Sequence, residues 1–217
     1  MMKKIFMILV CMTLALTLAC PALAEEGDET YAWSEPGEKN FIGALAARRE
    51  IRDEAEAYAY ALELWPLISG EPLPEGTREL DIDRHDTSYH FAILNMDDQA
   101  QYNVGFLSNG VVQHISKKDK DPLRYTGERK EGSALDDGTW KKAKDAITEW
   151  VEKVSPGVLE LVEPLKVYSV LDNGETQRLF ISALPLDPEY DGNLHIVVIL
   201  YADGRCEVTD YSCYGAG

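Results

Sequence analysis

Apolar residues recur at steps of three and four in two stretches of the chain, which is the pattern of a helix with one buried face. The first helix is expected over about 41–65, with Pro66 and Gly70 ending it. Its apolar stripe consists of Ile51, Ala55, Tyr58, Leu62 and Trp65. The second helix is expected before Pro156-Gly157, with the stripe Trp140, Ala143, Ile147, Trp150, Val151 and Val154.

After each helical stretch the period changes to two, which is typical of strands that bury one face. The expected strands are 79–84, 89–96, 101–107 and 111–116 after the first helix, and 165–170, 177–184, 194–201 and 205–211 after the second. Asn109-Gly110 and Asp203-Gly204 predict tight hairpin turns, because Asn, Asp and Gly tolerate positive φ.

The same order of elements therefore occurs twice, and the two hairpin turns lie 94 residues apart. We expect an α+β fold of two repeated units, each with one helix packed on a small antiparallel sheet of about four strands. The predicted boundaries are a disordered acidic leader at 25–40, a first unit at 41–118, a linker at 119–136 and a second unit at 137–217.

The third strand of the second unit is apolar on both sides. Its alternate positions are His195, Val197 and Ile199, where the first unit has Gln101, Asn103 and Gly105. An antiparallel sheet usually leaves one face to solvent, so the extra apolar face needs cover from the other unit or from a partner. His195, Val197 and Ile199 are thus the candidate binding surface.

Residues 1–24 have the pattern of a secretion signal. Lys3 and Lys4 precede an uncharged apolar run, and Ala22-Leu23-Ala24 provides small residues for cleavage. The protein is therefore expected outside the cytoplasm, secreted or in the cell envelope, with no stable membrane span after cleavage. Two alternatives remain open, an uncleaved anchor and a lipoprotein modified at Cys20.

The chain has a net charge of −17, which becomes −19 when the signal and its two lysines are removed. A chain this acidic repels nucleic acids and anionic membranes, so the expected partner is another protein. The sequence does not determine the oligomeric state.

Cys206 and Cys213 form an even pair in an oxidising compartment. A disulfide between them requires the chain to turn, because seven residues of straight strand span about 23 Å.

Chemistry-bearing motifs are few. Asp187, Glu189, Asp191 and Asn193 alternate with a glycine at the sixth place, as in the opening of a calcium loop, but Val198 stands where such a loop has a bidentate Glu. An ordinary acidic hairpin loop is the alternative. No catalytic motif occurs, so the sequence predicts no enzyme and no cofactor.

The organisation resembles tandem PepSY-like modules, which are cystatin-like secreted bacterial domains, and it shares an outline with tandem β-lactamase-inhibitor-like proteins. The residues that carry the resemblance are Ala143, Ala146, Pro156, Gly157, Tyr102, Val104 and Phe106, with the two hairpin turns, over 41–217. It implies a non-catalytic interaction module that regulates or inhibits an extracellular or envelope enzyme. The alternatives are an extracellular hydrolase with a carboxylate pair and a weak calcium-binding envelope protein.

Overall fold

The computed structural model describes residues 39–70, 77–84, 88–95, 101–118 and 126–214, all within one compact unit, Ser34–Gly217. The predicted signal, with Cys20, and nearly all of the predicted leader lie outside these residues. The helical elements are η1 (Phe41–Ala44), α2 (Glu54–Ser69), η3 (Gly132–Ala134), α3 (Asp137–Val154) and η4 (Val158–Glu160). The strands are β1 (Thr77–Arg84), β2 (Ser88–Asn95), β3 (Gln101–Leu107), β4 (Val112–Lys118), β5 (Glu128–Glu131), β6 (Lys166–Asp172), β7 (Thr176–Ala183), β8 (Asn193–Tyr201) and β9 (Cys206–Tyr214).

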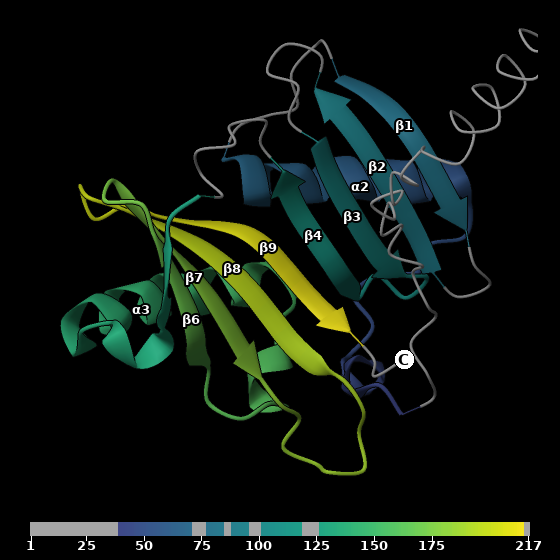
Figure 1. Ribbon diagram of the computed structural model, residues 1–217. Coiled ribbons are helices and arrows are strands. Elements are labelled where there is room, and N and C mark those ends of the chain that lie inside the picture. The colour runs from purple at the N-terminus through teal and green to yellow at the C-terminus, as the bar shows by residue number, and fades with distance from the viewer. Residues whose placement is uncertain (1–38, 71–76, 85–87, 96–100, 119–125, 215–217) are drawn as a thin grey trace, which may run out of the picture. The chain divides into compact units, whose positions relative to one another are not determined.

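All the described strands belong to a single antiparallel sheet of nine, in the order β1-β2-β3-β4-β9-β8-β7-β6-β5 (Figure 1). The prediction of two repeated units with separate sheets is therefore wrong. β4 and β9 join the two sets of strands that were expected to form separate sheets. They pair through His114–Ser212, Ile115–Tyr211 and Ser116–Asp210. Hydrogen bonding between these strands pairs backbone groups that two separate sheets would have left at open edges. The two sets of strands meet edge to edge and do not stack face to face.

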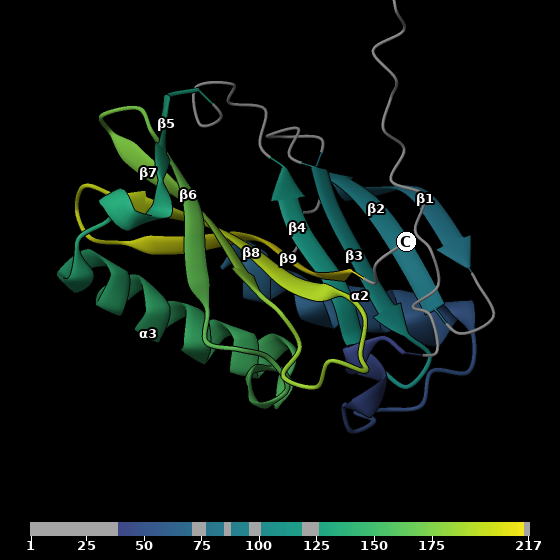
Figure 2. The ribbon, with the colours of Figure 1, turned by 60° about the horizontal axis from the view of Figure 1, so that its bottom comes forward.

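Both long helices lie on the same face of this sheet, below the strands in Figure 2. They also contact each other: the indole Nε1 of Trp150 on α3 donates to the carbonyl of Leu67 on α2. Arg48, which precedes α2, donates from its guanidinium to the carbonyl of Val154 at the end of α3. None of the helices in the described ranges is long and apolar enough to cross a membrane.

α2 departs from its predicted bounds and its predicted stripe. It begins at Glu54, where the Asp53 carboxylate caps it by accepting from the backbone N–H of Glu56 at 2.9 Å. It continues past Pro66 and ends at Gly70, whose φ of 73° suits a left-handed cap. The buried side chains are Ala57, Tyr60, Ala61, Leu64, Trp65 and Ile68. Of the predicted stripe, Trp65 and Ile51, which precedes the helix, are buried, Tyr58 and Leu62 pack partly buried against the core, and Ala55 is exposed.

α3 follows its prediction closely. The predicted stripe residues Ala143, Ile147, Val151 and Val154 are buried, and Trp140 and Trp150 pack against them partly buried. Asp136 caps the helix by accepting from the N–H of Thr139 at 2.9 Å. The polar residues between the stripe positions fix which side of α3 faces the sheet.

Each strand divides its side chains between two faces, and the register shows the division across seven strands. One row that faces the helices is apolar throughout: Phe91, Val104, Ile115, Tyr211, Ile196, Ile181 and Val167. The adjacent row faces away from the helices: His90, Gly105, His114, Ser212, His195, Ser182 and Lys166. Successive residues of a strand point to opposite faces, so the core lies between the first row and the helices.

Candidate functional site

We call the side of the sheet opposite α2 and α3 the helix-free face. It holds all three residues of the predicted binding surface, at alternate positions of β8. His195 and Val197 are partly exposed there, whereas Ile199 is only 3% exposed. The structure thus places the three residues together but leaves two of them accessible.

Beside His195 lies a group that the sequence did not single out, which we call the aromatic–arginine cluster: Tyr168, Phe180, His195, Arg129 and Arg178. The Tyr168 ring lies 6.1 Å from the Phe180 ring and 6.3 Å from the His195 ring, edge-on to the latter. The guanidinium carbons of Arg129 and Arg178 lie 5.4 Å and 5.2 Å from the centre of the Phe180 ring. Four strands, β5 to β8, contribute to this cluster.

A bulge in β6 brings Tyr168 into the cluster. Val167 pairs with Ile181 and Ser169 pairs with Phe180, so Tyr168 is an extra residue without a partner position on β7. Bulges of this kind redirect a side chain that regular pairing would place elsewhere. Tyr168 is 47% exposed, and is one of only three large apolar side chains in the described residues that are so open to solvent.

The electrostatics of this region combine two arginines with three groups whose pKa values are shifted by burial. Burial raises the pKa of the Asp210 carboxyl on β9 to about 6, although Arg178 and a hydrogen bond from Ser212 oppose the rise. Burial also lowers the pKa of His195 and raises that of Tyr168, the latter against the influence of Arg129. At neutral pH the Asp210 carboxyl is still largely ionised, so it offsets part of the positive charge of the two arginines.

Towards β2, the same face carries two buried histidines. A Cβ at Gly105 would lie 2.3 Å from Nδ1 of His90, so the His90 ring occupies the space above this glycine. His114 is hydrogen-bonded through Nε2 to the hydroxyl of Ser116 at 2.9 Å. Burial, and next the nearby His90, lower the pKa of His114 to about 3. No three His, Cys, Asp or Glu side chains of the described residues converge as ligands for a metal ion.

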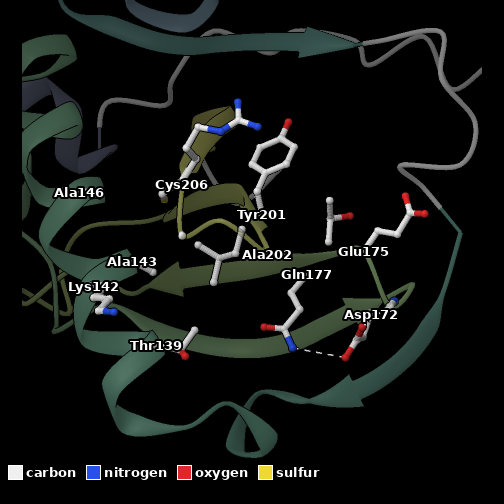
Figure 3. Close-up of a pocket in the computed structure, with 15 residues that line it drawn as sticks. Thr139, Lys142, Ala143, Ala146, Asp172, Glu175, Gln177, Tyr201, Ala202 and Cys206 are labelled. Atoms are coloured by element: carbon white, nitrogen blue, oxygen red, sulfur yellow. Dashed lines mark hydrogen bonds between the residues drawn. The ribbon is translucent and has the colours of Figure 1, made fainter.

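A cavity of about 710 Å³ lies on the other face, between α3 and the ends of the β6–β7 and β8–β9 hairpins (Figure 3). Thr139 and Lys142 line it from the helix, and Asp172 and Gln177 from the hairpin. Asp172 accepts from Lys130 at 3.1 Å, from the Gly174 N–H at 2.9 Å and from Gln177 at 3.3 Å. The Gly174, Lys130 and Gln177 contacts, in that order, hold the pKa of this carboxyl below its usual value.

Cys206, at the edge of this cavity, and Cys213 both lie on β9 and are free thiols. The strand between them supplies no turn, so the bridge considered from the sequence does not fit this geometry. Burial raises the pKa of Cys206 to about 11 and that of Cys213 to about 12. Thiols with such pKa values are almost wholly protonated at neutral pH and are poor nucleophiles.

Of the residues considered for calcium, Asp187, Glu189 and Asp191 lie in the exposed loop between β7 and β8, and Asn193 is the first residue of β8. The Asp187 carboxylate accepts from the N–H of Glu189 at 2.9 Å, and the N–H of Asp191 donates to the carbonyl of Lys39. This loop thus connects to the start of the described chain, and Asn40 and Asp191 form an isolated β-bridge. Asp187, Glu189, Asp191 and Asn193 are not among any converging set of ligands in the described residues.

Sequence reasoning missed most of the aromatic–arginine cluster for two reasons. Arg129 falls within the predicted linker, and the bulge that redirects Tyr168 leaves no mark on the period of the sequence. The alternation of Arg178, Phe180 and Ser182 is the signal that was available. No protein-family model matches the chain, and comparison with curated proteins and with solved structures gives no match either.

Proposed function

We propose that this protein acts by binding another protein through the helix-free face of the sheet, with the aromatic–arginine cluster at the centre of the contact. The observation that carries the proposal is the exposed Tyr168, packed against Phe180 and His195 on a face that neither α2 nor α3 covers. Tyrosine, phenylalanine and arginine are enriched in protein interfaces, and tyrosine and arginine dominate their binding energies.

The rigidity of the cluster supports this role. Its side chains come from paired strands and not from loops, and each contacts at least one other ring or guanidinium. Side chains that are already ordered lose less conformational entropy when a partner binds. An interaction module that regulates an enzyme, as the resemblance to PepSY-like modules implies, would use such a surface.

The cavity at α3 supports hydrolysis less well. A carboxylate pair that cleaves glycosides needs one carboxyl with a raised pKa to act as the general acid. The pKa of Asp172 is lowered instead, because its oxygens accept several hydrogen bonds. The thiol of Cys206, with its raised pKa, does not supply a nucleophile there.

The proposal is tested by affinity capture with the tagged protein and two variants, using extracts and medium of the source cells. Tyr168→Ala combined with Arg129→Ala removes the exposed part of the cluster. Leu186→Ala is the matched control, since Leu186 is 58% exposed but lies in the β7–β8 loop. A partner that wild type and the control retain and the double variant loses supports the proposal. Equal retention by all three proteins, or capture of no partner, contradicts it.

A further inference from the structure

We infer that the cavity between α3 and the ends of the β6–β7 and β8–β9 hairpins binds a small uncharged molecule with an apolar body and one hydrogen-bond donor, such as a hydroxylated aromatic compound. This site goes beyond the proposed protein-binding face, because it lies on the other side of the sheet. Its volume of about 710 Å³ is typical of small-molecule sites, which measure roughly 300–1,000 Å³.

The cavity exists because α3 presents small side chains to this end of the sheet. Thr139, Ala143 and Ala146 line it at steps of four and three, which places them on one side of the helix. Further along α3, the larger side chains of Ile147 and Val151 are fully buried against the core. Two alanines and a threonine do not fill the space that such side chains fill, so room remains for a ligand.

The inner wall of the cavity is apolar and uncharged. Leu200 of β8 and Cys206 of β9 pair across the hairpin and are partly buried, and Ala143 on α3 is 1% exposed. Burial raises the pKa of the Cys206 thiol to about 11, so this thiol is protonated and uncharged at neutral pH. An apolar group that enters here removes its own surface and that of the wall from water, which favours binding.

The charged side chains of the lining do not favour a charged ligand. Lys142 and Glu175 have opposite signs, and both are exposed at the mouth of the cavity. Arg205 is exposed as well, and its Nε donates to Asp203 at 2.7 Å. Asp172, the fourth charged group of the lining, already accepts from three donors. A charged ligand would lose its hydration without gaining an unpaired counter-charge inside the cavity, so an uncharged ligand is favoured.

One polar group of the lining is oriented to accept a hydrogen bond from a ligand. Nε2 of Gln177 donates to Oδ2 of Asp172 at 3.3 Å, so the amide oxygen lies at the other end of the group, on the side of Thr139 (Figure 3). Asp172 is itself fixed by Lys130 at 3.1 Å and by the Gly174 N–H at 2.9 Å. An acceptor that is oriented before binding selects a ligand that donates, through a hydroxyl or an N–H group.

The test is an NMR titration of the isotope-labelled protein at neutral pH with three naphthalene probes of similar size. Naphthol is uncharged and donates a hydrogen bond, methoxynaphthalene is uncharged without a donor, and naphthoate carries a negative charge. We expect naphthol to shift the backbone amides of Thr139, Ala143 and Gln177 and to bind most tightly. Methoxynaphthalene should bind about fivefold more weakly, because it lacks one uncharged hydrogen bond. Naphthoate should bind at least about tenfold more weakly, because its charge finds no counter-charge inside.

Two variants separate the contribution of the space from that of the hydrogen bond. Ala146→Phe places a ring in the cavity and should weaken naphthol binding at least about tenfold. Ala59→Phe is the matched control, because Ala59 is an exposed alanine of α2 that is not part of the lining, and it should change the affinity by less than about twofold. Gln177→Ala should weaken naphthol about fivefold and leave methoxynaphthalene unchanged, because only naphthol uses the acceptor.

Four results would overturn the inference: no naphthol-induced shifts at the cavity, equal affinities for naphthol and methoxynaphthalene, tightest binding of naphthoate, or equal weakening of both uncharged probes by Gln177→Ala. Undiminished naphthol binding by Ala146→Phe would equally reject the site. Circular dichroism shows whether each variant is folded, and the order of the three probes on wild type decides the inference where a variant is not. These outcomes are distinct from failure of the proposed function, which concerns the opposite face of the sheet.

Discussion

The two faces of the sheet, built from the same strands, carry side chains of different kinds. The row from Phe91 to Val167 on the helix side is apolar across seven strands, and Tyr211, Ile196 and Ile181 in it have no exposed surface. One residue along each strand, the row from His90 to Lys166 carries histidine, serine, glycine and lysine. The first row supplies hydrophobic stabilisation under α2 and α3. Of the second row, only His195, Ser182 and Lys166, on β8, β7 and β6, are open to solvent.

The helix-free face itself differs along the sheet. Towards β2 it holds buried groups, with His90 7% and His114 4% exposed. Towards β5 it holds Tyr168, which is 47% exposed, and Arg129, which is exposed as well. Because polar groups are buried at one end and an aromatic group is exposed at the other, we place the proposed binding surface in the β5–β8 part of the face.

The largest expected effect separates the two faces at adjacent residues of β8. Ile196→Ala removes a fully buried side chain from the helix-side row and should lower the free energy of unfolding by about 2–5 kcal/mol. His195→Ala, one residue earlier and partly exposed on the other face, should lower it by about 1 kcal/mol or less. Urea unfolding followed by tryptophan fluorescence measures both. Equal losses would mean that the helix-free face is also part of the main core.

A smaller effect is expected at Gly105, where the two histidines of the face come together. A Cβ there would approach Nδ1 of His90 to 2.3 Å, so Gly105→Ala should cost about 1–3 kcal/mol of stability. The ring must move to relieve the overlap. A double-mutant cycle with His90→Ala should therefore show a coupling energy that favours the double variant. Additive losses would place the His90 ring away from Gly105.

The next effect is a pH dependence carried by His114. Its pKa is about 3 in the folded chain and 6.5 ordinarily, so between these values the unfolded chain binds more protons. Its contribution to stability is present above pH 6.5 and is lost as the pH falls. Between pH 7 and 5.5 the loss amounts to about 1 kcal/mol.

Asp210 acts with the opposite sign, because its raised pKa of about 6 makes the folded chain bind more protons as the pH falls. The His114 contribution is therefore measured as a difference between wild type and His114→Gln over the same pH range. The variant should lose about 1 kcal/mol less on acidification. Parallel curves for the two proteins would show that His114 is not kept neutral by the fold.

The smallest expected effect on stability is at the proposed binding centre. Arg129→Ala removes an exposed side chain whose contact is with one ring, so the free energy of unfolding should change by less than about 0.5 kcal/mol. Thermal unfolding of the variant beside wild type measures it. A loss above about 2 kcal/mol would make Arg129 a structural residue and weaken its assignment to binding.

The sequence predicted the buried side of a helix well where polar residues separate the apolar positions. In α3, charged residues separate the apolar positions, and the predicted stripe Ala143, Ile147, Val151 and Val154 is buried. In α2, apolar residues occupy most sides of the helix, as in Ala57-Tyr58-Ala59-Tyr60-Ala61, so several stripes fit the same residues. The predicted stripe is therefore correct only in part: Trp65 is buried, Tyr58 and Leu62 are partly buried, and Ala55 is exposed. The turns at Gly110 and Gly204 have the expected positive φ, 78° and 86°.

The single sheet and the aromatic–arginine cluster depend on pairing between strands, which the pattern of apolar and polar residues does not predict. Alternation shows which residues share a face of a strand, but not which edges pair. The β4–β9 pairing joins His114 to Ser212, far apart in the chain, and converts two expected sheets into one. In the same way, Arg129, Tyr168 and Phe180 come together only through the pairing of β5, β6 and β7. His195, Val197 and Ile199 share one face because all three lie on β8, as the alternation in the sequence indicated, whereas their role in binding stays a prediction.

The central claim, that a partner docks on the β5–β8 part of the helix-free face, is tested most directly by NMR chemical-shift mapping during titration with the partner recovered by affinity capture. We expect the shifted backbone amides to gather at Arg129, Tyr168, Phe180 and His195, with little change along α3. Shifts that gather instead at Thr139, Lys142 and Gln177 would place binding in the cavity beneath α3 and contradict the account.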